Sequence, residues 1–172
     1  MQWRTALLGE TRSPMKNWFQ VQHLDVERLL AQWRWLCPGP KKLVACSAFG
    51  HMFLADESGH IWWLDVDVGA LSKIADSELD FRNLLADPEK RDEWFGDTAE
   101  QTAASKGLIP NEGQCVGFEI PLVFKVAGPS KPYLIDIYEN VSFLGDLNEQ
   151  IANVPDGGKV KLVIGARPST SH

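Results

Sequence analysis

Four side chains in the middle of the sequence have the chemistry of metal ligands. His51 and His60 each follow a glycine, and Asp65 and Asp67 come shortly after the second histidine. Imidazole nitrogens and carboxylate oxygens bind Zn²⁺ and Mn²⁺, so these residues would form a metal or small-molecule site if their strands are neighbours. A histidine that follows a glycine is also an ordinary polar residue at a turn, and we expect this simpler role.

A single cysteine lies between two glycines in "NEGQCVGFEIP", residues 111–121. A cysteine nucleophile needs a general base within reach and a third group that orients the base. Cys115 has no histidine near it in the sequence, and the chain contains no GxSxG motif of the kind that presents a serine nucleophile. The alternating apolar residues around Cys115 predict instead a small apolar side chain in a crowded strand.

Motifs for phosphate and calcium binding are also missing from the sequence. There is no GxGxxG and no GxxxxGK[ST] motif, and "DGGKV" at 156–160 lies between a predicted helix and a predicted strand, which is the wrong context for a phosphate-binding loop. "DVDVGA" at 65–70 lacks the third oxygen ligand and the terminal glutamate of a calcium loop. We therefore expect no catalytic residue, no cofactor and no resident metal ion.

The composition is typical of a globular protein. Of the 172 residues, 44% are hydrophobic and 23% are charged, and a chain of this length folds as one domain without needing a metal or a disulfide. No apolar run is long enough to span a membrane, and the apolar part of "MQWRTALLGE" is too short for a secretory signal. The three cysteines, Cys37, Cys46 and Cys115, are far apart, which favours reduced thiols in a cytoplasmic protein.

The charge is distributed unevenly along the chain. Residues 1–42 carry seven basic and three acidic side chains, whereas residues 56–100 carry four basic and thirteen acidic ones, a net charge of −9. This pattern does not resemble the basic footprint of a nucleic-acid-binding protein. An acidic segment repels phosphate backbones and attracts a basic protein, although it also occurs as an ordinary solvated face. The seven tryptophans supply core residues or an interface, and a homodimer would be consistent with them.

The first half of the hydrophobic pattern predicts one helix followed by strands. We expect an amphipathic helix within residues 23–40, with Asp25 as its N-cap and Pro38 at its end. The period then changes to two over residues 42–75, which predicts an antiparallel meander of three or four short strands. Ser58-Gly59 suits a tight hairpin turn within it.

Helices are expected again after the meander, at three capping patterns. Ser77 and Asp80 have the spacing of a capping box. Asp87-Pro88 is a cap followed by a proline at the first helical position, and a further helix starts at Asp97 and ends at Gly107.

The last third of the chain returns to strands. We expect strands from Gln114 and over residues 131–139, a helix within residues 143–155, and a final strand over residues 159–165. Separate runs of strands and helices indicate an α+β fold, with an antiparallel meander and a second strand group packed against several helices. The expected organisation is an N-terminal arm or first helix over residues 1–22, a single domain over 23–164 and a disordered tail over 165–172.

Three stretches, taken in order, resemble a known family. "AFGHMFLADESGHIWWLDVDVGALSKIADSELDF" resembles its glycine-turn meander, "GQCVGFEIP" its "GQCYxFxxPP" motif, and "FLGDLNEQIANVPDGGKVKL" its "LGQIHEQ…LPDGxKI" ending. The family is the C-terminal domain of immunity proteins that protect bacteria from DNase toxins of the type VI secretion system, long catalogued as a domain of unknown function. The resemblance runs from about Leu36 to Ile164. The chain differs from the family pattern at Val116, usually an aromatic residue, at Leu122-Val123-Phe124, and at Asp146 and Asn148, usually Gln and His.

The resemblance implies a non-enzymatic immunity protein that neutralises a secreted nuclease toxin. The acidic middle of the chain suits this role, because acidic side chains take the place of phosphates at a basic nuclease and steer its association, while aromatic side chains anchor it. The residues assigned to this surface are Asp56, Glu57, Asp65, Asp67, Asp76, Glu78 and Asp80, with Trp62, Trp63 and Trp94 as anchors or, alternatively, as core residues.

Two other functions remain open at this stage. The first is a small-molecule or metal-binding module, or a minor enzyme, that uses His51, His60, Asp65 and Asp67; it requires a concave site where these four side chains converge. The second is an adaptor with an unknown protein partner. None of the three interpretations involves direct contact with nucleic acid or with a membrane.

Overall fold

The computed structural model describes residues 20–124, 129–155 and 157–161, and these form an α+β fold with two antiparallel sheets. The larger sheet has the strand order β1-β2-β3-β4, and β5 pairs with β6 in the smaller one. The four consecutive strands make the meander predicted from the sequence. Their bounds are β1 Lys42–Cys46, β2 Met52–Ala55, β3 Ile61–Asp65 and β4 Ala70–Ala75, and those of the second pair are β5 Gln114–Phe118 and β6 Pro132–Asp136.

The first helix is much shorter than predicted. Asp25 is its N-cap, as expected, but α1 covers only Val26–Leu29 and is followed by the 3₁₀ helix η2, Ala31–Trp33. Trp33, the last residue of this 3₁₀ helix, has a fully buried side chain. Its indole N–H donates to the carbonyl of Val141 at 2.9 Å. Tertiary packing of one tryptophan therefore prevails over the local helical pattern.

The three later capping patterns behave as predicted. Ser77 caps α2, Glu78–Leu84, and Asp87 caps α3, Pro88–Phe95, with a proline at the first helical position. α4 covers Asp97–Ser105, and Gly107 follows it with a positive φ.

The second strand group ends earlier than its alternating pattern suggests. β6 stops at Asp136, whose side chain accepts the N–H groups of Tyr138 and Glu139 and so caps α5, Ile137–Ile151. The strand predicted over 159–165 is not formed as far as Lys161, where the description ends. The predicted arm lies outside the described residues up to 19, and the predicted tail lies wholly outside them.

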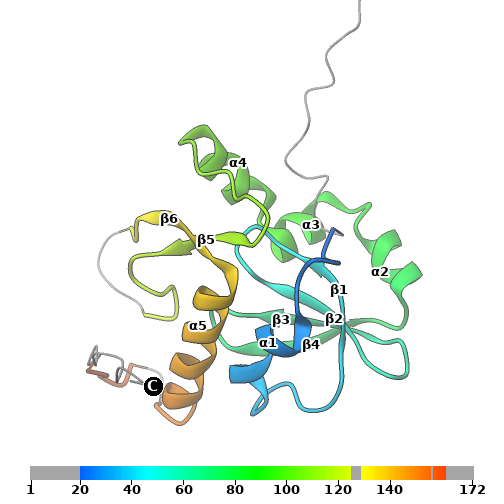
Figure 1. Cartoon of the computed structure of the whole chain (residues 1–172), viewed down its shortest axis with the longest axis horizontal. Coiled ribbons are helices and arrows are strands. Elements are labelled where there is room, and N and C mark those ends of the chain that lie inside the picture. The colour runs from blue at the N-terminus through cyan, green and yellow to red at the C-terminus, as the bar shows by residue number, and fades with distance from the viewer. Residues whose placement is uncertain (1–19, 125–128, 156, 162–172) are drawn as a thin grey trace, which may run out of the picture.

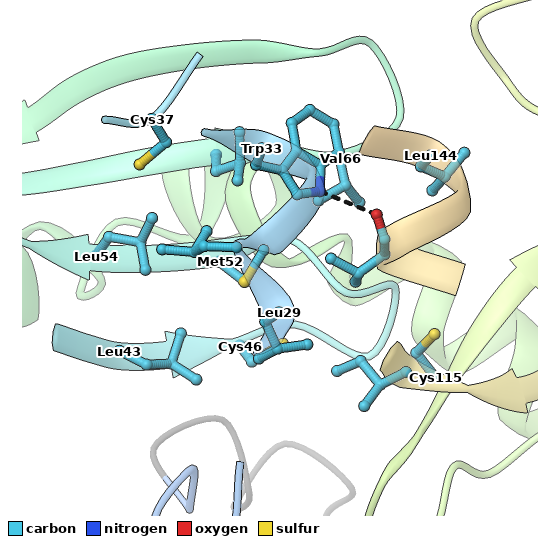
Figure 2. Packing of buried hydrophobic residues seen from close by; sticks show 14 of the residues in the cluster. Leu29, Trp33, Cys37, Leu43, Cys46, Met52, Leu54, Val66, Cys115 and Leu144 are labelled. Atoms are coloured by element: carbon cyan, nitrogen blue, oxygen red, sulfur yellow. Dashed lines mark hydrogen bonds between the residues drawn. The ribbon is translucent and has the colours of Figure 1, made fainter. Parts of the chain in front are cut away.

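One hydrophobic core joins the two sheets. It packs Trp33 and α5 against one face of the larger sheet, through Met52 and Leu64, and it reaches Cys115 on β5. Figure 2 shows this core, with the hydrogen bond from Trp33 to the backbone of α5. Replacing a fully buried tryptophan with alanine costs about 3–5 kcal/mol, so this contact is central to the fold.

A second core covers the other face of the larger sheet. Phe53 stacks on Phe81 of α2 and on Phe95 of α3, with ring centroids 5.0 and 4.4 Å apart. Figure 1 shows the result, with α5 beside the sheet under the β5–β6 pair and α2 and α3 on the opposite side. Within the described part of the chain, no helix has the length and apolarity needed to cross a membrane.

Candidate functional site

Three of the four predicted ligand-type side chains meet at one end of the larger sheet. His51 directly precedes β2, while Asp65 ends β3 and Asp67 lies in the β3–β4 turn. The start of β2 and the end of β3 meet because Met52 pairs with Leu64 in antiparallel register. His51 Nδ1 lies 3.4 Å from Asp65 Oδ1, and His51 Nε2 lies 3.5 Å from Asp67 Oδ2. One ligand atom from each of the three residues lies within 4.8 Å of the others.

Hydrogen bonds fix the backbone around these side chains. Asp65 Oδ1 accepts the N–H of Asp67 at 3.0 Å, and the N–H of Val66 donates to His51 Nδ1 at 3.3 Å. The carbonyl of Val66 accepts the side-chain amide of Asn148, on α5, at 3.2 Å. The β3–β4 turn is therefore tied both to the β1–β2 loop and to the helix.

The cluster is largely buried and rich in negative charge. The side chains of His51, Asp65 and Asp67 are 13, 19 and 16% exposed. Burial raises the pKa of Asp67, the nearby Asp65 carboxylate adds to the rise, and His51 opposes it. Among the described residues, no Lys or Arg forms an ion pair with either aspartate, so His51 is the only basic side chain that offsets their charge.

His60 does not join this cluster, because it lies at the opposite end of the same strands. Its Nδ1 lies 3.3 Å from Asp56 Oδ2, which also accepts the indole N–H of Trp62 at 2.9 Å. The other carboxylate oxygen accepts the N–H groups of Ser58 and His60. The bond from Trp62 is the largest of several effects that lower the pKa of Asp56 to about 2. Asp56 and His60 therefore close the β2–β3 turn.

The predicted acidic residues divide between the two ends of the sheet. Ile61 pairs with both Ala55 and Ala75, which brings the β2–β3 turn and the end of β4 to the same end of the sheet. Asp65 and Asp67 lie at the opposite end of the strands, so the seven residues do not form one continuous surface. The residues at the first end are Asp56, Glu57, Asp76, Glu78 and Asp80.

Some of these carboxylates are compensated within the protein. Lys73 Nζ lies 2.6 Å from Asp76 Oδ1 and lowers the pKa of this aspartate by hydrogen bonding. Glu78 pairs with Arg82 at 2.9 Å. Their charges are thus partly offset before any partner binds.

The three predicted aromatic anchors have different positions. Trp62 is half-buried at the first end, where it donates to Asp56. Trp63 points to the other face of the sheet and packs against the second core, edge-on to His51. Trp94 is 5% exposed and packs against Phe81. Of the two alternatives for these tryptophans, Trp94 is therefore a core residue, whereas Trp62 and Trp63 are both partly exposed.

Further exposed acidic residues on α3 were missed by the sequence analysis. α2 and α3 bury Phe81 and Phe95 against the same core, so both helices cover the same face of the larger sheet. The helical spacing of Glu89 and Glu93, opposite the buried Trp94-Phe95, is the signal that identifies them. The name acidic ridge is used below for the exposed carboxylates of the β2–β3 turn, of α2 and of α3 with its N-cap that form no ion pair in the described chain: Glu57, Asp80, Asp87, Glu89, Asp92 and Glu93.

Cys115 has the surroundings of a core residue. Its side chain is fully buried, and Asn140 Nδ2 donates to its sulfur at 3.4 Å. Burial raises the pKa of Cys115 to about 12, despite this hydrogen bond. Thiolate is the reactive form of cysteine, so the geometry does not support a nucleophile at this position.

Two surface cavities in the described part of the chain lie away from His51, His60, Asp65 and Asp67. One, of about 570 Å³, is lined by residues 20–24 and 109–114 together with Cys46, Ser47 and Glu100 among others. The other, of about 770 Å³, lies between Trp35 and the end of α5. Neither is lined by His51, His60, Asp65 or Asp67. The four side chains do not converge on one site either, because His60 pairs with Asp56 at the opposite end of the strands.

Comparison with models of protein families, with curated proteins and with solved structures gives no match for this chain.

Proposed function

We propose that this protein is a non-enzymatic cytoplasmic binding protein, an immunity protein that neutralises a secreted nuclease toxin through its acidic ridge. The observation that carries the proposal is the ridge itself. Its carboxylates are exposed, they belong to the β2–β3 turn, to α2 and to α3 with its N-cap, and no ion pair within the described chain offsets them.

Electrostatics explains why such a ridge suits a nuclease. A nuclease binds the phosphates of its substrate with basic side chains. A group of carboxylates carries the same negative charge as these phosphates and can bind the same basic side chains. Complementary charge raises the association rate of two proteins from about 10⁵–10⁶ M⁻¹s⁻¹ to as much as about 10⁸–10⁹ M⁻¹s⁻¹ at low salt. Fast capture matters for a protein that must bind a toxin before the toxin reaches DNA.

Two further observations support the proposal. The order of motifs in the sequence resembles that of type VI secretion immunity domains. The one cysteine with a candidate motif, Cys115, is buried and has a raised pKa, which is the setting of a core residue.

The test is affinity capture followed by kinetics. The tagged full chain is used as bait in lysate of its host at low salt, and the bound proteins are identified by mass spectrometry. We expect a basic nuclease, whose DNA cleavage is inhibited by the purified bait. Its association rate should fall at least about tenfold between 0.05 and 0.5 M NaCl, because salt screens exposed charges beyond about 10 Å.

A matched pair of double variants locates the surface. Glu89→Lys with Glu93→Lys changes the ridge, whereas Asp146→Lys with Glu149→Lys makes the same change of net charge on α5, where both residues are exposed. We expect only the ridge variant to slow association. Equal effects of the two variants, or a rate that does not depend on salt, would rule out the ridge, and capture of no nuclease would argue against the toxin-neutralising role.

A further inference from the structure

The geometry points to a divalent-cation site, for Zn²⁺ or Mn²⁺, between the β1–β2 loop and the β3–β4 turn, with His51 and Asp67 as ligands and Asp65 as a positioning residue. This end of the larger sheet is opposite the end where Asp56 and Asp76 lie. The site shares no residue with the acidic ridge, and it does not depend on the proposed immunity function.

The separation of the two ligand atoms suits an ion better than a direct hydrogen bond. His51 Nε2 and Asp67 Oδ2 are 3.5 Å apart, beyond the usual N–H···O range of about 2.7–3.2 Å. An ion about 2.1 Å from both atoms would make an angle of roughly 110° between them, which is the tetrahedral value that zinc prefers. Neither side chain would have to move far to bind it.

His51 Nδ1, the ring nitrogen that faces away from the proposed ion, lies beside a carboxylate. His51 Nδ1 lies 3.3 Å from a donor, the N–H of Val66, and 3.4 Å from an acceptor, Asp65 Oδ1. In this structure Nδ1 accepts the N–H of Val66; an ion on Nε2 would leave the ring proton on Nδ1, which would then donate to Asp65 Oδ1 in place of that bond. A carboxylate on the far side of the ring is the usual partner of a metal-binding histidine.

Charge and burial favour an ion at the same place. Two carboxyl groups and one imidazole lie together in a cluster whose side chains are less than one-fifth exposed. Burial of uncompensated charge is costly, and no Lys or Arg pairs with Asp65 or Asp67 in the described chain. A divalent ion would offset the charge of the carboxylates. The remaining exposure of the side chains leaves room for water to complete the coordination.

The scaffold holds the site in position before the ion binds. The amide of Asn148 fixes the carbonyl of Val66, and Asp65 Oδ1 fixes the N–H of Asp67. The ring of His51 lies between Phe49 and Trp63, with centroid distances of 6.5 and 6.1 Å. Rigid support of this kind reduces the ordering that binding must impose.

The histidine–aspartate pair at the opposite end provides a control. His60 and Asp56 are 3.3 Å apart, but Asp56 already accepts hydrogen bonds from Trp62 and from two backbone N–H groups. An ion there would have to displace these bonds. His60→Gln therefore removes an imidazole that also lies beside an aspartate, without touching the proposed site.

The experiment is calorimetric titration of the full chain, stripped of metal with a chelating resin, with ZnCl₂ and with MnCl₂. We expect one equivalent of ion to bind at the site, His51→Gln and Asp67→Asn each to weaken binding at least about tenfold, and His60→Gln to leave it unchanged. Circular dichroism of each variant checks that it folds.

A second measurement keeps the proposal testable if a variant fails to fold. Mn²⁺ broadens the NMR signals of nearby nuclei, and in the wild-type chain the broadening should centre on the amides of residues 50–52 and 65–68. Absence of binding at millimolar ion, equal binding by the wild type and Asp67→Asn, or broadening centred elsewhere would overturn the proposal. In that case the cluster is a histidine held between two carboxylates without an ion.

Discussion

Asn148 on α5 donates its side-chain amide to the carbonyl of Val66 in the β3–β4 turn across 3.2 Å. The same nitrogen donates to the carbonyl of Leu144 at 2.9 Å, and the side chain is 3% exposed. A helix near the end of the chain thereby fixes the turn that carries Asp65 and Asp67.

Removing this side chain should destabilise the protein. Asn148→Ala leaves the carbonyl of Val66 without its side-chain donor in a buried environment, and we expect a loss of about 1–3 kcal/mol in the free energy of unfolding. Urea unfolding measures the difference. Gln150→Ala, an exposed position on the same helix, should change stability by less than about 0.5 kcal/mol. Equal effects of the two variants would show that the Asn148 contact is weak in solution.

The close approach of Gly69 to Asn148 can be tested with a matched glycine. Gly69 and Gly59 both have positive φ, 67° and 83°, so alanine is strained at either position. A Cβ at Gly69 would lie 2.8 Å from Asn148, whereas nothing lies within 4 Å of one at Gly59. We expect Gly69→Ala to lower the free energy of unfolding by about 1–3 kcal/mol more than Gly59→Ala does. Equal losses would mean that α5 moves away at little cost.

The low pKa of Asp56 predicts how its contribution to stability depends on pH. The pKa falls from the ordinary value of 3.8 to about 2 in the folded protein, mainly because of the hydrogen bond from Trp62. A carboxylate whose pKa is lower in the folded protein than in the unfolded chain stabilises the fold at any pH above its unfolded pKa. This stabilisation is lost as the pH falls through the folded pKa.

Asp56→Asn should therefore melt at a lower temperature than the wild type at pH 7, because asparagine has only one acceptor oxygen for these donors. The difference in melting temperature between the wild type and Asp56→Asn should become smaller as the pH falls from about 4 to about 2. Melting curves followed by tryptophan fluorescence measure it. Glu57→Gln, at an exposed neighbour with no hydrogen bond in the described part, should melt like the wild type throughout. A difference in melting temperature that does not change with pH would contradict a stabilising role for the low pKa of Asp56.

The three thiols should be unreactive in the folded protein. Cys37, Cys46 and Cys115 are buried, and burial raises the pKa of each of them. Thiolate is therefore scarce and inaccessible at neutral pH. We expect DTNB to label all three cysteines in guanidinium chloride and none at a comparable rate under native conditions. Rapid native labelling of Cys115 would reopen the possibility of a catalytic thiol.

The sequence by itself determined the local features of the fold. The caps at Asp25, Ser77 and Asp87 were predictable, since a capping side chain bonds to backbone within three residues of itself. The turn at Gly59 and the four meander strands were predictable for the same reason, because period-2 patterns and turn glycines act over a few residues. The α+β class follows from the order of these segments.

Only the tertiary structure decided what these segments bring together. Because of the strand register, His51 lies beside Asp65 and Asp67, whereas His60 lies at the opposite end of the strands, although all four are within seventeen residues of sequence. The length of the first helix and the burial of Trp94 were likewise set by packing, as Trp33 and Phe95 show. Such contacts join residues far apart in the chain, and their energies depend on shape and distance that no local pattern contains.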